Sequence, residues 1–363
     1  MEIMKPFDVT DTTLTSTSIA EPDTASGEVE WVDRAILQTY AIPNSSTLLL
    51  ACSKLMENNL IYFIGNAGAV VKIDPSTNIV TDFGAHTGFY TACESGINGF
   101  IYAVGTSGIV LKVDTSLELL STFGAYTNDY NACSKLGNFI YCIGNGDVMK
   151  INTSNDTVSF FGSYSGEYQA CDITINGDIY CVGNANKILK ISTSNDTVTE
   201  ITQDLTPSLF NCTTGADGNI YAVGVYLVLK VDTSNDSIIY FGGTSGGLLP
   251  RCSALGGDGL IYSAGGGSSS SEVIAVNTSN NSIDEFGSYP GDMRTMSKSS
   301  TGDIYMSNGY SIVLAGNGYR LEDEVILSST SRVYKSAVDF NKDKPDVGVA
   351  LVPPSWVDLQ YTN

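Results

Sequence analysis

The sequence predicts an all-β protein whose main part is a seven-bladed β-propeller. An Ile-Tyr pair recurs seven times along the 363 residues, at intervals of 39 to 43 residues. Each interval also holds four short apolar runs separated by turn residues. A period of this length fits one four-stranded antiparallel sheet, which is the repeating unit of a propeller. The pairs are Ile61-Tyr62, Ile101-Tyr102, Ile140-Tyr141, Ile179-Tyr180, Ile220-Tyr221, Ile261-Tyr262 and Ile304-Tyr305.

One repeat, residues 87–124, illustrates the expected blade. Asn98-Gly99 predicts a tight hairpin between the first two strands, because both residues tolerate positive φ. Asp114-Thr115-Ser116 is a polar corner between the third and fourth strands, and we expect its side chains to hydrogen-bond their own turn. The glycine and the final glutamate of a calcium loop are missing from this corner. The expected strands are 89–93, 100–104, 109–113 and 119–123.

The ring is expected to be closed by the beginning of the chain. The seventh repeat provides three strands and then leaves the pattern, whereas residues 35–40 resemble an outer strand such as 78–83. We therefore expect residues 33–41 to complete the last blade, which removes the gap between the first and last blades. The propeller then spans residues 32–317. A Gly/Ser-rich stretch, residues 265–271, is expected to be a flexible loop within the sixth repeat.

Cysteine positions indicate packing rather than disulfides. Six of the eight cysteines fall at the same place in successive repeats, and Met296 takes that place in the seventh. Equivalent positions in adjacent blades are expected to exceed the limit of about 7 Å between Cα atoms for a disulfide. Cys142 and Cys181, which follow Ile-Tyr pairs, are expected to pack in the same way. The six are Cys52, Cys93, Cys133, Cys171, Cys212 and Cys252.

Charge and hydropathy argue against several classes of partner. The chain has 18 Lys and Arg against 39 Asp and Glu, a formal net charge of −21. Such a charge repels phosphate backbones and anionic lipids, so no nucleic acid and no membrane is an expected partner. No run reaches about 18 apolar residues, the length of a membrane span, and the start lacks the pattern of a secretion signal. We expect the chain to stay soluble in the cytosol unless it leaves as part of an assembly.

No catalytic or metal-binding motif stands out. His86, in a polar loop, is the one histidine, and the sequence has no Cys-x-x-Cys, Gly-x-Ser-x-Gly or phosphate-binding glycine loop. A metal site built on two or three histidines is therefore impossible within one chain. Paired carboxylates could still hydrolyse glycosides, but no pair is singled out. The sequence predicts that the protein is not an enzyme and has no cofactor and no metal.

The loops that join the outer strand of one blade to the inner strand of the next are the candidate binding surface. In three of them a tyrosine is followed three residues later by an acid. A tyrosine face beside a carboxylate suits a sugar ring or a basic patch on a protein. Alternatively, the tyrosines cap the blade core and the acids only solvate the loop. The pairs are Tyr126 with Asp129, Tyr164 with Glu167, and Tyr289 with Asp292.

The two chain ends show a further pattern. Together they resemble a small aromatic β-module found in chitin-binding-type carbohydrate modules and in tail-associated structural proteins of tailed bacteriophages. In that family a tryptophan precedes the pattern, and here the only upstream tryptophan is Trp31. The resemblance implies one module made of residues 1–31 and 318–363, with the propeller inserted between its halves. The segments that carry the resemblance are 319–325, 332–336 and 353–359.

The resemblance also implies a role. Exposed aromatics of this pattern stack on sugar in carbohydrate modules, which makes Trp31, Tyr334 and Trp356 candidate ligand-binding residues; in so small a module they could instead be the core. The implied protein is a structural component of a phage virion, in the tail, neck or fibre region, assembled in the host cytoplasm. Implied partners are other virion proteins, further copies in a homo-oligomer, and a host-surface glycan or protein receptor.

Two other functions remain open. The repeats resemble seven-bladed propellers of bacterial lyases that cleave cyclic peptide antibiotics, so the alternative is a lyase-like or glycan-degrading propeller enzyme. Such an enzyme would require a convergent His/Glu or carboxylate pair on the loop face. A bacterial adhesin is the third possibility, and it would need an export signal.

Overall fold

The computed structural model divides the chain into two compact units, Met1–Gln38 with Ala315–Asn363, and Thr39–Leu314. In the first unit, β1 (Glu21–Pro22) pairs antiparallel with β2 (Val29–Glu30). The part of the chain described here contains strands and no helix, hence no helix that could cross a membrane. The described residues are 21–22, 29–30, 36–41, 49–52, 59–66, 69–77, 79–184, 187–201, 208–244, 249–266, 270–300, 302–307 and 311–315.

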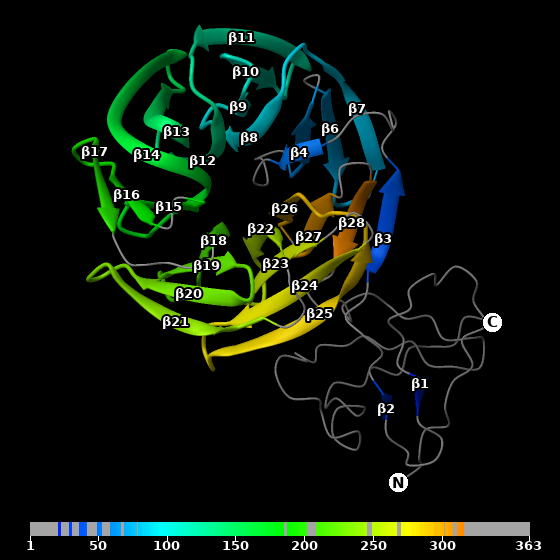
Figure 1. Cartoon of the computed structure of the whole chain (residues 1–363). Helices are drawn as coiled ribbons and strands as arrows, with labels where there is room; N and C mark the ends of the chain where they lie inside the picture. Colours follow the sequence, from blue (N-terminus) through cyan, green and yellow to red (C-terminus); the bar gives the residue numbers. More distant parts are fainter. Residues whose placement is uncertain are drawn as a thin grey trace, which may run out of the picture. The chain divides into compact units, whose positions relative to one another are not determined.

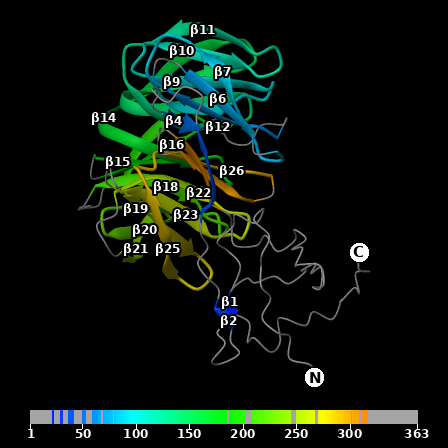
Figure 2. The ribbon, with the colours of Figure 1, turned by 90° about the vertical axis from the view of Figure 1, so that its right-hand side faces the viewer.

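The second unit is a ring of antiparallel sheets, which is a β-propeller (Figure 1). Both views place β11 and β25 at opposite margins of the ring (Figures 1 and 2). Two of its four-stranded sheets come first in the chain. They are β4 (Leu49–Cys52), β5 (Ile61–Gly65), β6 (Ala69–Asp74) and β7 (Ile79–Ala85), then β8 (Tyr90–Ser95), β9 (Phe100–Gly105), β10 (Ile109–Asp114) and β11 (Leu119–Ala125).

A six-stranded sheet follows, and then three more sheets of four strands. The six strands are β12 (Tyr130–Leu136), β13 (Phe139–Asn152), β14 (Thr157–Ile173), β15 (Ile179–Gly183), β16 (Ile188–Ser192) and β17 (Thr197–Ile201). The next two sheets are β18 (Leu209–Thr214), β19 (Ile220–Gly224), β20 (Leu227–Asp232) and β21 (Ser237–Gly243), then β22 (Pro250–Leu255), β23 (Ile261–Gly266), β24 (Ser270–Asn277) and β25 (Ser282–Pro290). The last is β26 (Thr295–Lys298), β27 (Ile304–Ser307), β28 (Ser311–Ala315) and β3 (Ile36–Ala41).

The described part of the ring thus has five four-stranded sheets and one six-stranded sheet, where the sequence predicts seven separate blades. The difference arises at β14, which is 17 residues long. Its first part, from Thr157 to Ser163, pairs with β13, and its second part, from Tyr168 to Ile173, pairs with β15. Between them Glu167 still pairs with Asn145 of β13, so the connecting loop stays extended and the two sheets merge.

Neighbouring innermost strands close the ring. They contact one another in the order β4, β8, β12, β14, β18, β22 and β26, and β26 contacts β4. The outer edge of the last sheet is β3, which lies beside β28 although it comes from the beginning of the chain. No gap is therefore left between the first and last innermost strands.

The Ile-Tyr pairs form the core of the sheets. Ile101 and Tyr102 on β9 are fully buried, as are the corresponding residues of the other second strands. These strands are buried on both faces because neighbouring sheets pack face to face; one cluster joins Tyr102 and Val104 to Ile140 and Met149 of the next sheet. The third strands contribute in the same way, whereas the outer strands are half exposed.

Cysteines occupy the positions that the repeat predicts, with one exception. In five repeats the cysteine stands opposite the residue after the Ile-Tyr pair, and Met296 stands opposite Met306 in the same place. Cys252 is instead opposite Ala264, one position later, and Ser253 takes the expected place. The expectation for Cys252 is therefore wrong by one residue. Among the cysteines whose side chains are described, none forms a disulfide.

The Gly/Ser-rich stretch also differs from expectation. Gly265 and Gly266 belong to β23, and Ser271 belongs to β24, where they continue the hairpin by pairing Gly266 with Ser271. Only residues 267–269 of this stretch lie outside the described part. The hydrogen bonds of the ladder, which a composition argument ignores, extend the strands through most of the segment that was expected to be a loop.

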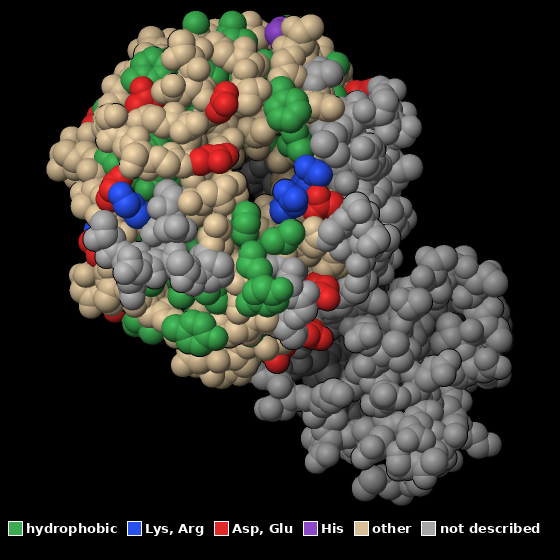
Figure 3. Space-filling view, viewed as in Figure 1, with side chains coloured by type: hydrophobic (Ala, Val, Ile, Leu, Met, Phe, Trp, Pro, Cys, Tyr) green, Lys and Arg blue, Asp and Glu red, His purple; other side chains and the backbone are tan. Residues whose placement is uncertain are grey.

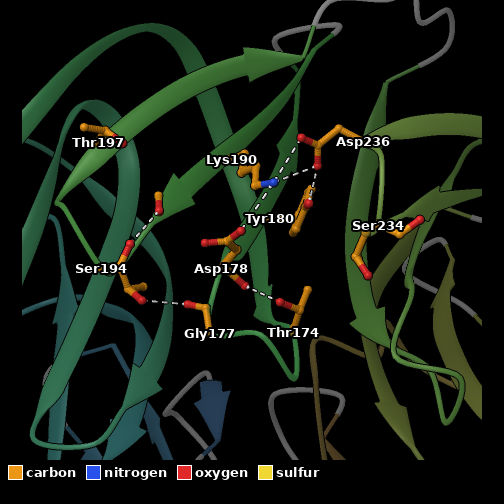
Figure 4. A network of polar contacts seen from close by, with 12 residues as sticks. Thr174, Gly177, Asp178, Tyr180, Lys190, Ser194, Thr197, Ser234 and Asp236 are labelled. Atoms are coloured by element: carbon orange, nitrogen blue, oxygen red, sulfur yellow. Dashed lines mark hydrogen bonds and ion pairs between the residues drawn. The ribbon is translucent and has the colours of Figure 1, made fainter.

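The polar corners hold their own turns, as predicted, and also join neighbouring sheets. Ser234 N–H donates to Asp232 Oδ1 at 3.0 Å, which fixes the corner between β20 and β21. In the same corner Asp236 has a φ of 60° and reaches Lys190 of the preceding sheet, with Nζ–O distances of 2.9 and 3.0 Å (Figure 4). Tyr180, from the Ile-Tyr pair, donates its hydroxyl to the same carboxylate. Burial raises the pKa of Tyr180 to about 12, and this hydrogen bond acts in the same direction.

We call this Lys-to-Asp contact between sheets the inter-sheet latch. It recurs with the same geometry at three corners, because Asp156 and Asp196, like Asp236, have positive φ. Lys112 contacts Asp156 of the following sheet at 2.6 Å. Lys150 makes the corresponding contact with Asp196 at 2.8 Å, between the two halves of the six-stranded sheet. The sequence analysis missed this role, since the lysine and the aspartate lie 44 to 46 residues apart.

Candidate binding site at the channel mouth

Five innermost strands, β8, β12, β14, β18 and β22, begin with a close backbone approach to a glycine of the neighbouring strand. Asn145 N–H donates to the carbonyl of Asp129 at 3.0 Å, so the loop before β12 lies directly against residues 144 and 145 of β13. A Cβ on Gly144 would be 2.1 Å from that carbonyl oxygen. Gly105 and Gly183 have the same relation to the carbonyls of Phe89 and Glu167. In these five sheets the glycine three residues after the tyrosine of the Ile-Tyr pair therefore positions the loop of the channel mouth.

The loop then enters its strand through a register shift. Tyr130 and Ala132 pair with consecutive residues of β13, so Asn131 between them is a bulge residue. The same shift occurs at the start of the other innermost strands whose pairing there is recorded, and Arg294 takes the corresponding place immediately before β26. None of these side chains is buried. The bulge ring consists of Leu50, Thr91, Asn131, Gln169, Phe210, Arg251 and Arg294.

A second ring lies two positions earlier in the chain and forms the rim. Its members differ in chemistry from sheet to sheet, while the backbone that carries them repeats. Phe89 is 41% exposed and Leu249 is 38% exposed. The rim consists of Phe89, Asp129, Glu167, Ser208, Leu249 and Asp292. The mouth therefore combines apolar, acidic and basic groups on one rigid frame.

Two predicted ligand-binding tyrosines are part of the core instead. Tyr126 is 6% exposed and Tyr164 is 9% exposed. Each hydroxyl accepts a hydrogen bond from the N–H of the close-approach glycine, at 3.0 Å from Gly105 and 3.1 Å from Gly144. Burial raises the pKa of Tyr126 to about 12. These two side chains are buried where stacking on a ligand would require exposure, and they cap the sheet core, the alternative interpretation of the sequence.

Edge contacts between rings hold these caps. The ring of Tyr126 meets that of Tyr130 at 5.3 Å and 79°, and Tyr164 meets Tyr168 at 5.2 Å and 85°. Such T-shaped pairs are a favourable arrangement of aromatic quadrupoles. Tyr130 also donates to Asp147 at 2.7 Å, so the start of β12 is held at both ends of the side chain.

The three predicted acids all belong to the rim, in two different environments. Asp129 and Glu167 are exposed. Asp292 is only 14% exposed and binds two arginines, with 3.0 Å from Arg251 Nε to Oδ1 and 2.9 Å from Arg294 Nη2 to Oδ2. The sequence analysis named Asp292 without its partners, because nothing in the local pattern links it to a residue 41 positions earlier.

Opposite charges face each other across the mouth. Asp129 and Glu167 precede the innermost parts of β12 and β14, whereas the arginines belong to the starts of β22 and β26, and other innermost strands separate the two pairs in both directions around the ring. The space-filling view shows a central hollow with basic side chains on one side and acidic side chains on the other (Figure 3). A ligand in the hollow would experience a directional field.

Four predicted site residues cannot be placed. Trp31, Tyr334 and Trp356 lie outside the described residues, and for Tyr289 only the backbone, in β25, is described.

The described residues contain no group of three His, Cys, Asp or Glu side chains arranged to hold a metal ion. The ring Nδ1 of His86 lies 2.9 Å from the carbonyl of Thr87, next to it in the chain. A cleft of about 430 Å³ is lined partly by Thr244, Asp284 and Glu285. These residues belong to or follow outer strands, so this cleft is separate from the channel mouth.

Comparison with known proteins supports the fold alone. No family model matches the sequence, and no curated protein matches it. A streptogramin B lyase structure is similar over 76% of this chain and 96% of its own, with 12% identity and a TM-score of 0.67. A catalytically inactive histidine-to-alanine variant of virginiamycin B lyase from Staphylococcus aureus, with quinupristin, is similar over 76% and 97%, with 13% identity and a TM-score of 0.63.

A protein of another kind is almost equally similar. The WD40 β-propeller domain of Doa1 covers 76% of this chain and 96% of its own length, with 12% identity and a TM-score of 0.62. A lyase and a WD40 domain therefore share this architecture, and the likeness does not distinguish an enzyme from a binding protein.

Proposed function

We propose that this chain is a non-enzymatic structural component of a tailed-phage virion, which presents its propeller to a host-surface receptor or to a neighbouring virion protein. The observation that carries the binding role is the channel mouth, where a repeated backbone displays exposed side chains of differing chemistry. Asp129 and Glu167 are available there to accept hydrogen bonds from sugar hydroxyls or to pair with basic residues of a protein. Rigid scaffolds that display variable loops commonly serve recognition.

We propose further that the propeller has seven blades. The six-stranded sheet would count as two of them, one ending and the next beginning within β14. Each half has its own Ile-Tyr pair, Ile140-Tyr141 and Ile179-Tyr180, and β14 changes partner between Glu167 and Tyr168. This division supports a propeller over residues 32–317 that is closed by residues 33–41.

The virion assignment rests on the chain ends. Residues 1–31 and 318–363 would form the aromatic module that attaches the protein to other virion proteins or binds glycan. The compact units that divide the chain near residues 38 and 315 are compatible with such an insertion. Assembly in the host cytoplasm, and homo-oligomers within the particle, belong to the same proposal.

Incubation with purified surface polysaccharide of the host tests the binding role. The full chain should retain the polysaccharide without releasing reducing ends, and an Asp129→Asn/Glu167→Gln variant should retain less. Release of shortened products would contradict the non-enzymatic proposal and favour the lyase-like or glycan-degrading alternative. Antibodies against the propeller should label assembled particles, and unlabelled particles would contradict the virion assignment.

A further inference from the structure

We propose that Arg251 and Arg294 form an anion-binding site that holds the carboxylate or phosphate of an acidic glycan at the channel mouth. This inference rests on the proposed binding function and specifies the ligand class of the same surface. Its shared chemistry is an oxyanion carried by a sugar polymer, either a uronate carboxylate or a phosphodiester.

The two arginines are positioned before any ligand arrives. They occupy corresponding places at the starts of neighbouring innermost strands, and Asp292 binds one nitrogen of each. Their side chains are 45% and 31% exposed, whereas that of Asp292 is 14% exposed. Asp292 therefore holds both guanidinium groups close together by charge attraction, although its Oδ1 makes no hydrogen bond, and this proximity reduces the entropy that a ligand would have to remove.

Charge accounting leaves this cluster positive. Two guanidinium groups against one carboxylate give one net positive charge, in a chain whose formal net charge is −21. No other arginine falls within the described residues, so these two are the available bidentate donors. Because Asp292 engages Nε of Arg251, both terminal nitrogens of that fork remain for an oxyanion.

The surroundings favour a sugar polymer over a small anion. Phe210 occupies, in the preceding sheet, the position that corresponds to Arg251, and it is partly exposed. Leu249 and Phe89 add apolar surface to the rim. Sugar rings stack on aromatic faces. Asp129 and Glu167, on the far side of the mouth, can accept hydrogen bonds from hydroxyls of the same polymer.

Binding of three defined probes tests the inference: an oligogalacturonate, a glycerol-phosphate oligomer and a neutral maltooligosaccharide. The wild type should bind at least one acidic probe more tightly than the neutral one. Arg251→Gln and Arg294→Gln should each weaken that binding about tenfold, the effect of losing one charge-assisted hydrogen bond. Which acidic probe binds identifies the source of the oxyanion.

Lys298→Gln is the matched control, since it removes one positive charge from β26 at an exposed position four residues from Arg294. It should leave the affinity unchanged. Arg251→Lys keeps the charge and loses the fork, so an intermediate affinity is expected, and thermal unfolding of each variant reports whether it folds.

Equal affinity of wild type and both glutamine variants would overturn the inference, as would failure of the wild type to bind either acidic probe. Retention of the host polysaccharide by wild type and variants distinguishes failure of the arginine site from failure of the proposed function. Retention by wild type and variants alike would leave the binding role standing without the arginine site, whereas no retention by the wild type would remove both.

Discussion

The substitution Gly144→Ala would test whether close backbone approach builds the channel mouth. The new Cβ would lie 2.1 Å from the carbonyl oxygen of Asp129 and 2.8 Å from Cα of Tyr130, both backbone atoms. Gly144 has no left-handed φ, so alanine adds steric conflict without intrinsic backbone strain. The loop would have to retreat by about 1 Å to restore an ordinary contact, which costs about 2 kcal/mol as overpacking.

A hydrogen bond would be lost in addition. The retreat would break the 3.0 Å contact from Asn145 N–H to Asp129, worth about 1 kcal/mol. We therefore expect the free energy of unfolding to fall by about 3 kcal/mol, which for a unit of this size lowers the thermal midpoint by about 6 °C. Thermal and urea unfolding of the full chain measure this change.

Gly224→Ala is the graded control. Its Cβ would lie 2.7 Å from the carbonyl oxygen of Ser208, a milder conflict, so a loss of about 1 kcal/mol is expected. Gly144→Ala should also weaken any binding that depends on Asp129. If Gly144→Ala unfolded at the wild-type midpoint, or no earlier than Gly224→Ala, close approach would not be what sets the mouth.

Three other perturbations probe the frame. A double-mutant cycle of Lys190→Met and Asp236→Asn should give a coupling of about 1 kcal/mol that declines in high salt, because both side chains are partly exposed; a coupling near zero would deny the latch any energetic role. Burial opposes ionisation of Asp217, but hydrogen bonds hold the pKa of this carboxyl at about 2, below its ordinary 3.8. The stabilising contribution of ionised Asp217 is present above pH 3.8 and is lost as the pH falls through about 2. Wild type should therefore be more stable than Asp217→Asn by about 1 kcal/mol after solvent screening above pH 3.8, and this difference should vanish below about pH 2. A difference that persisted below about pH 2 would contradict the assignment. Burial raises the pKa of the Cys181 and Cys212 thiols well above 9.0, so iodoacetamide at pH 8 should modify them only after unfolding, as mass spectrometry of the intact chain can measure.

Much of the fold follows from the repeat, because the repeat is a packing rule. Ile101 and Tyr102 are buried for the same reason in every sheet. The chain turns at Asn98-Gly99 as predicted, but not as the tight two-residue hairpin that was expected, because only Gly99 has positive φ and the last pair of the hairpin is Ser95 with Ile101. The single-residue displacement of Cys252 escaped prediction, since only the ladder of β22 against β23 decides which residue faces which. The merging of two sheets through β14 likewise depends on hydrogen bonds across a loop.

The site was only half predictable. The acids Asp129, Glu167 and Asp292 were named because an acid three residues after a tyrosine is visible in the sequence. Whether Tyr126 points inward or outward depends on the bulge at Gly124 of β11, which reverses the alternation of side chains and leaves no trace in composition. The pairing of Asp292 with Arg251 arises from the ring order of strands far apart in the chain.

The inter-sheet latches have a consequence for how such a chain can change in length. Lys112, Lys150 and Lys190 each form an equivalent ion pair with an aspartate of the following repeat. A recombination that deletes or duplicates one of these repeats would again place a lysine beside an equivalent aspartate, so no charge would be left unpaired. Lys230 pairs instead with Asp217 of its own sheet, so a crossover placed there would find no matching ion pair. We therefore expect gains and losses of repeats to be tolerated in the part of the ring that contains Lys112, Lys150 and Lys190, and to be destabilising in the part that contains Lys230.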